Sequence, residues 1–144
     1  MLLVDSSGAS IPSYGWRRLA EGLEYRAVPL GSGSFPAMHQ VRLDPRWYRL
    51  RLGLARDGGH PLGTVSDMRQ RLGAVLAVNG GYFDDRGRPL GYLREAERLV
   101  VPDVATGAAF TGVLVVRPEG TRILHRDAFQ PGPALLALQA GPRL

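Results

Sequence analysis

The sequence predicts an α+β fold: a mixed, largely antiparallel sheet with one or two short helices. Its 144 residues, 44% hydrophobic and 22% charged, are enough to bury a core, and this composition argues against intrinsic disorder. The 19 glycines and 11 prolines predict many turns between short elements. One segment carries a clear helix pattern, whereas roughly six to eight segments carry strand patterns.

Residues 1–15 are rich in Ser, Gly and Pro, and we expect a flexible leader there, followed by a single domain over 16–144. A loop is expected at 31–34, and a tight hairpin turn at 118–120. Apolar and polar residues alternate in most of the other segments, which is typical of strands. Strands are predicted at residues 22–30, 38–44, 48–55, 90–95, 109–117, 121–125 and 134–140.

The clearest helix pattern runs from Thr64, the expected N-cap, to Gly73, the expected stop. Asp67 follows the cap by three residues, where an acidic side chain favours the first turn. Residues 74–78 then read A-V-L-A-V, apolar at every position. Because such a run is typical of a strand covered on both faces, we expect it at the centre of the sheet.

Charge and composition exclude several classes of function. All 18 basic residues are Arg, and the net charge is +5, but the arginines are scattered and form no run. We therefore predict no nucleic-acid partner, and a basic nucleic-acid binder is the least favoured alternative. The absence of cysteine excludes disulfides and thiolate metal sites. No apolar stretch is long enough to predict a signal peptide or a membrane span.

The stretch N-G-G-Y-F-D-D at 79–85 is the main candidate site. Asn79 would place an amide at the end of a rigid strand, and Gly80 and Gly81 would let the main chain adopt positive φ and approach a ligand. The alternative is that Asn79 and Gly80 form an ordinary hairpin turn. The residues alone do not decide between the two.

Asp84 and His39 are the candidate catalytic side chains. D-D-R-G at 84–87 also suits an ordinary turn, with Asp84 capping backbone amides and Gly87 in the left-handed position. His39 is expected on the apolar face of its strand, where a hydrogen-bonded structural role is the alternative. The three histidines show no ligand spacing, so no metal site is predicted.

Several motifs together resemble the phosphodiester glycosidase family, which includes the enzyme that uncovers mannose 6-phosphate and bacterial proteins of exopolysaccharide biosynthesis. They are H-x-V-R-L-D-P at 39–45, G-A-V-L-A-V-N-G-G-Y-F-D at 73–84, R-P-L-G at 88–91 and A-L-Q-A-G-P-R-L at 137–144. The resemblance extends over nearly the whole chain from Trp16 onward.

The resemblance implies hydrolysis of a sugar 1-phosphodiester of the N-acetylglucosamine type, which releases free sugar and a phosphomonoester. Asn79, Gly80, Gly81 and Arg143 would then bind the substrate, and His39 and Asp84 would act in catalysis. No cofactor is called for, and a divalent cation is left open. The alternatives are a non-catalytic carbohydrate or cell-envelope binding module and an inactive fragment.

Related domains continue into a second half with a D-G-G-G-S type motif, so we expect this chain to be an incomplete domain that lacks its C-terminal part. An incomplete sheet would leave strand edges exposed around residues 134–144, which predicts self-association or a complementing C-terminal fragment as partner. The family resemblance also suggests an exported or cell-envelope location, although the sequence shows no signal peptide.

Overall fold

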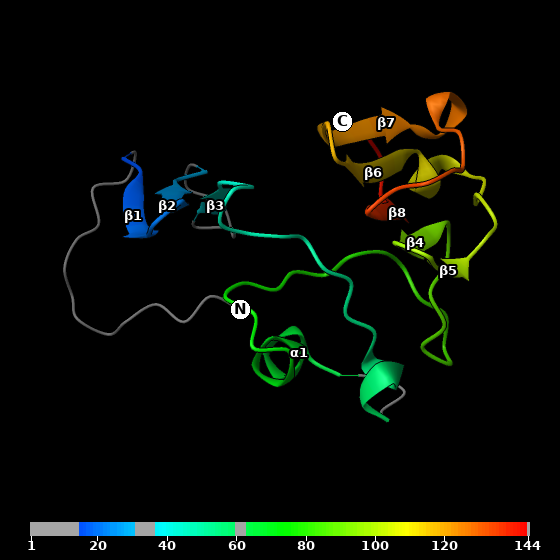
Figure 1. Ribbon diagram of the computed structural model, residues 1–144, viewed down its shortest axis with the longest axis horizontal. Helices are drawn as coiled ribbons and strands as arrows, with labels where there is room; N and C mark the ends of the chain where they lie inside the picture. The colour runs from blue at the N-terminus through cyan, green and yellow to red at the C-terminus, as the bar shows by residue number, and fades with distance from the viewer. Residues whose placement is uncertain (1–14, 31–36, 60–62, 144) are drawn as a thin grey trace. The chain divides into compact units, whose positions relative to one another are not determined.

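The computed structural model describes residues 15–30, 37–59 and 63–143 (Figure 1). The chain forms two compact units, whose boundary falls between Leu50 and Arg51. The described residues form two antiparallel sheets and one short α-helix, which confirms the predicted α+β class. The expected leader, except for Gly15, and the expected loop at 31–34 lie outside the described residues. The single domain over 16–144 stays a prediction.

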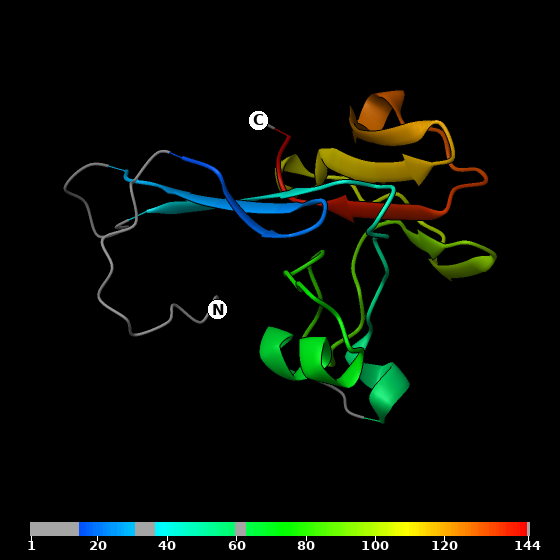
Figure 2. The ribbon, with the colours of Figure 1, turned by 60° about the vertical axis from the view of Figure 1, so that its left-hand side comes forward.

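The unit that ends at Leu50 contains a three-stranded antiparallel sheet in the order β1-β2-β3, blue to cyan in Figure 2. Its strands are β1 (Arg17–Ala20), β2 (Leu23–Val28) and β3 (Met38–Leu43). The second and third confirm the alternation seen in the sequence. The first was not predicted, because R-R-L-A is too short to show a period of two.

The strand predicted at 48–55 is wrong. Residues 48–54 belong to no strand, and a 3-10 helix, η1 (Ala55–Gly58), follows them. The backbone N–H of Leu52 donates to the Glu95 carboxylate at 3.1 Å, and the Arg51 side chain donates to the same oxygen. A side chain thus takes the hydrogen bond that a neighbouring strand would have taken, so the alternation of leucines was misleading here.

The predicted helix is confirmed as α1 (Val65–Arg71). The Thr64 hydroxyl accepts a hydrogen bond from the Asp67 N–H at 3.1 Å, as an N-cap residue does. Gly73 follows the last turn with φ of +59°, the left-handed conformation that ends many helices.

The unit that begins at Arg51 contains a five-stranded antiparallel sheet in the order β5-β4-β8-β6-β7 (Figure 1). The hairpin at 118–120 is confirmed, since Arg117 of β6 pairs with Gly120 of β7. The strand predicted from residue 90 begins later, because Gly91 has φ of +79°. The one predicted from residue 109 begins after a 3-10 turn. The elements are β4 (Leu93–Glu95), β5 (Arg98–Val101), η2 (Ala108–Phe110), β6 (Gly112–Arg117), β7 (Gly120–His125), η3 (Arg126–Ala128) and β8 (Leu136–Ala140).

Two expectations about the centre and the edges of the sheet are wrong. Residues 74–78 form no strand, and Val75 and Val78 are 61% and 75% exposed. The central strand is β8, which pairs with β4 on one side and with β6 on the other. Residues 136–140 are therefore no edge, and the edges of the sheet are β5 and β7. An apolar run shows that a segment is hydrophobic, but it does not show which segment pairs with it.

Leu93 and Leu136 are buried on one face of this sheet. The larger buried cluster lies on the other face and contains Val113, Val115 and Ala137. The Tyr92 and Phe129 rings belong to this cluster and pack edge to face on each other, with centroids 5.0 Å apart. Gln139 continues the same face, because it stands opposite Val113 in the register. A polar side chain in this position requires hydrogen-bond partners, which are described below.

Candidate functional site

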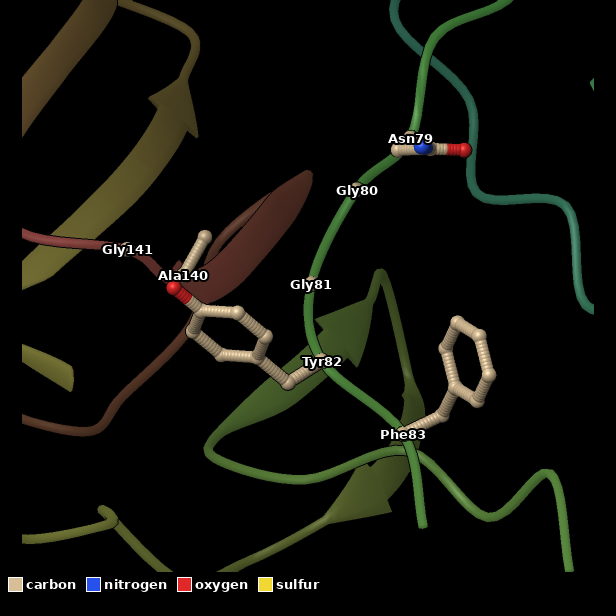
Figure 3. Close-up of a pocket in the computed structure, with 7 residues that line it drawn as sticks. All are labelled: Asn79, Gly80, Gly81, Tyr82, Phe83, Ala140 and Gly141. Carbon is tan, nitrogen blue, oxygen red and sulfur yellow. The ribbon is translucent and has the colours of Figure 1, made fainter. Parts of the chain in front are cut away.

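The N-G-G-Y-F stretch lines an open depression of about 380 Å³ (Figure 3). Residues 79–83 form one wall, and Ala140 and Gly141, at the end of β8, form the other. None of the seven lining residues carries a charge. The structure thus brings two of the motifs quoted above, at 73–84 and 137–144, to the same depression.

The backbone does not turn at Asn79 and Gly80, so the hairpin-turn alternative is wrong at this point. A tight Asn-Gly hairpin turn requires positive φ at both of its central residues, and neither Asn79 nor Gly80 has it. The turn lies further on, where the Gly87 N–H donates to the Asp84 carbonyl and Gly87 has φ of +71°, as predicted. Tyr82 accepts from the Leu90 N–H, and Phe83 forms a β-bridge with Pro89. Residues 82–90 therefore form a small hairpin.

Gly80 and Gly81 let this segment approach β8 closely. A Cβ atom at Gly81 would lie 3.0 Å from the Gln139 carbonyl oxygen and 3.4 Å from a Leu138 methyl group. At Gly80 it would lie 3.3 Å from the other Leu138 methyl group. The expectation of positive φ at these glycines is wrong. The structural reason for having glycine here is close packing against a neighbouring strand.

The side chains of the segment point to two sides. Figure 3 shows the Tyr82 ring reaching toward Ala140 and Gly141, while Asn79 and Phe83 lie on the other side. The chain bends at Gly81, between Asn79 and Tyr82. The Tyr82 ring also packs edge to face on Phe110 at 5.1 Å. Sequence reasoning had given Tyr82 and Phe83 no role, although both lie inside the quoted motif.

Asp84 is held by its own turn. Its Oδ1 accepts from the backbone N–H groups of Arg86 and Arg88, at 3.0 and 2.8 Å, and its Oδ2 accepts from the Arg88 guanidinium at 2.6 Å. The backbone hydrogen bond from Arg88 is the main cause that lowers the pKa of the Asp84 carboxyl below its ordinary value. Asp84 is thus an ionised turn residue with both oxygens engaged.

Gln139 locks the other wall of the depression in place. The side chain is 0% exposed, and its Oε1 accepts from the N–H groups of Tyr92 at 3.0 Å and Ala105 at 2.8 Å. Its Nε2 donates to the carbonyls of Ala105 at 2.9 Å and Phe110 at 2.8 Å. Four hydrogen bonds satisfy the whole amide and join three segments to β8. Gly91 is required beside it, because a Cβ atom there would lie 2.9 Å from Oε1.

Sequence reasoning assigned no role to Gln139 or Gly91. Both stand in quoted motifs, Q-A-G-P and R-P-L-G, and this was the only signal in the sequence. In the structure the two motifs depend on each other, because the Gln139 side chain of one packs against Gly91 of the other and leaves no room for a Cβ atom there.

Arg143 lies beside the depression and does not line it. Its backbone N–H donates to the Thr111 hydroxyl at 2.9 Å, and Gly112 donates to the Gly141 carbonyl at 3.1 Å. These bonds fix the chain as it leaves β8. Within the part of the chain that the structure describes, the Arg143 guanidinium makes no ion pair.

His39 belongs to the other unit, in β3. Its side chain is exposed and does not point inward as expected, and its Nδ1 shares a hydrogen bond of 2.6 Å with the Tyr25 hydroxyl. The two rings are stacked, with centroids 5.9 Å apart. This contact suits the structural alternative considered from the sequence. A catalytic role beside Asn79 stays a prediction.

Over residues 15–30, 37–59 and 63–143, no three His, Asp or Glu side chains gather in a way that could hold a metal ion. In the same ranges, no helix has the length and apolar character needed to cross a bilayer. No family model, curated protein or solved structure matches this chain.

Proposed function

We propose that the depression between residues 79–83 and the end of β8 binds a sugar 1-phosphodiester of the N-acetylglucosamine type, and that the protein hydrolyses it at the anomeric carbon. Water adds as the bond between C1 and the phosphate oxygen breaks, so that free sugar and a phosphomonoester are released. The observation that supports this best is that the N-G-G-Y-F stretch, on which the family resemblance mainly depends, lines a depression.

Unused hydrogen-bond donors support the binding of an anionic diester. Among the described residues, nothing accepts from the Asn79 side-chain amide or from the backbone N–H groups of Gly80 and Gly81. Successive main-chain N–H groups and a side-chain amide can surround a phosphate oxygen without a charged partner. Arg143 adds a cation near the same wall, where it would compensate the charge of the diester.

The proposed chemistry passes through a state with positive charge on the sugar ring. The ionised Asp84 would stabilise the charge on the ring. A phosphate group leaves readily, so only weak acid assistance to the leaving oxygen is required.

The second candidate is a carbohydrate-binding module without turnover. One observation favours it: both oxygens of Asp84 already accept hydrogen bonds from their own turn. A carboxylate in this state stabilises the hairpin, and it would have to exchange these bonds to face a substrate.

Incubation with the methyl diester of N-acetylglucosamine 1-phosphate separates the two candidates. Release of N-acetylglucosamine and methyl phosphate, followed by NMR, supports the hydrolase, whereas saturable binding without release supports the module. Asn79→Ala should abolish binding and leave the fold intact, because the Asn79 side chain is exposed and makes no hydrogen bond among the described residues. Gln130→Ala removes an exposed amide elsewhere and is the matched control. If the wild-type protein neither binds nor cleaves the diester, both candidates are wrong.

A further inference from the structure

Phe83 presents a large apolar surface to solvent on a backbone that cannot easily move. Its ring is 62% exposed, although it lines the depression. The bridge to Pro89 and the hydrogen bonds on both sides of it, from Leu90 to Tyr82 and from Asp84 to Arg88, hold the residue in the hairpin. A fixed, exposed aromatic ring in a depression is suited to receive a ligand surface.

The polar groups of the depression lie beside this ring. Asn79 is on the same side of the segment as Phe83 (Figure 3), and the chain bends at Gly81 between them. Between them lie Gly80 and Gly81, whose N–H groups have no acceptor among the described residues. The depression therefore has an apolar part at Phe83 and a polar part at Asn79 and the two glycines.

The apolar and polar parts suit different portions of one ligand. A pyranose ring has a face made of C–H groups, which are slightly positive and complement the negative face of an aromatic ring. A phosphodiester is strongly hydrated and requires hydrogen-bond donors, which a phenyl ring does not offer. We infer that Phe83 is the platform on which the sugar ring stacks, while Asn79 and the two glycine N–H groups hold the phosphodiester. This inference rests on the proposed function and specifies how the site divides its ligand.

The test compares two probes: the methyl diester of N-acetylglucosamine 1-phosphate, and methyl N-acetylglucosaminide, which lacks the phosphate. Phe83→Ala should weaken the binding of both by at least about tenfold, because stacking is lost for both. Asn79→Ala should abolish the binding of the diester, as stated above, and leave that of the methyl glycoside unchanged. Phe83→Trp should retain binding, since it keeps an aromatic face. Ile123→Ala, which removes an apolar side chain of similar exposure on β7, should change neither.

NMR gives a readout that a merely structural role of Phe83 would not affect. Protons on the stacked face of the sugar should shift upfield in the complex with the wild-type protein, because they lie over the ring, and this shift should be absent with Phe83→Ala. If Phe83→Ala binds the diester as tightly as wild type, the stacking inference is overturned, and the proposed function stands. If the variant instead loses self-association with unchanged sugar binding, Phe83 contacts a second copy and the inference is equally overturned. If the wild-type protein binds neither probe, the proposed function itself fails.

Discussion

Replacement of Gln139 by leucine should be among the most damaging single changes in the unit that begins at Arg51. Leucine fills a similar volume but leaves three backbone groups without partners: the N–H groups of Tyr92 and Ala105, and the Ala105 carbonyl. The Phe110 carbonyl loses its bond to Gln139 but still accepts from the Arg126 side chain at 3.5 Å. An unsatisfied buried group costs roughly 1–3 kcal/mol. Ala105 and Phe110 are only partly buried, so water can reach part of this cluster. At the lower value for each of the three groups, the free energy of unfolding should fall by about 3 kcal/mol.

Urea unfolding followed by circular dichroism measures this loss, and amide exchange locates it. The Tyr92 and Ala105 amides should exchange much faster in Gln139→Leu than in wild type, because Oε1 is their acceptor. Gln130→Leu makes the same chemical change at an exposed position and should cost less than about 0.5 kcal/mol. A loss below about 1 kcal/mol in Gln139→Leu, with both amides still protected, would refute the reasoning.

Four further substitutions test the packing of the glycines, the hairpin and the helix cap. Gly81→Ala should destabilise by about 1–3 kcal/mol in urea unfolding, since its Cβ would meet a backbone carbonyl at 3.0 Å. Gly80→Ala meets a movable methyl group and should cost less; equal losses would contradict the packing argument. Hydrogen bonds lower the pKa of Asp84 in the fold, so its contribution to stability is present above about pH 4 and is lost as the pH falls below that. The urea midpoint of Asp84→Asn should consequently depend less on pH than that of wild type. If the two midpoints change with pH in the same way, ionised Asp84 does not stabilise the fold. Thr64→Ala should lower the free energy of unfolding by about 1 kcal/mol and speed amide exchange at Asp67. Unchanged exchange at Asp67 would show that the Thr64 cap does not stabilise the helix.

Self-association stays a prediction, and the structure changes where it would occur. Residues 136–140 of the expected edge form the central strand β8, while β5 and β7 are the outer strands of the sheet in the described part of the chain. Light scattering during size-exclusion chromatography measures association. A Pro in β7 would block main-chain pairing at that edge.

Local signals predicted local structure well. Thr64, Asp67 and Gly73 predicted the helix because capping depends on residues within one turn of each other. The hairpin between β6 and β7 was predicted for a similar reason, since its strands are neighbours in sequence. Gly87 was assigned to the left-handed position of a turn, and its φ of +71° confirms this.

Pairing between distant segments could not be predicted in this way. Residues 74–78 have the composition of a buried strand, yet β8 occupies the centre, because pairing depends on which backbone groups meet across the fold. The candidate site follows the same rule. The N-G-G-Y-F stretch was recognised from its residues, but its opposite wall at Ala140 and Gly141 was not.

The amino-acid order alone thus specified the class of fold, the helix with its cap, several strands and the stretch around Asn79. Only the folded chain showed that Gly81 packs on β8 and that Gln139 bonds to three segments, whereas the turn capped by Asp84 was foreseen from D-D-R-G. The physical reason is the range of the interactions. Caps and turns join residues a few positions apart, whereas the Gln139 amide meets partners 29 to 47 positions away, and no local pattern encodes such a meeting.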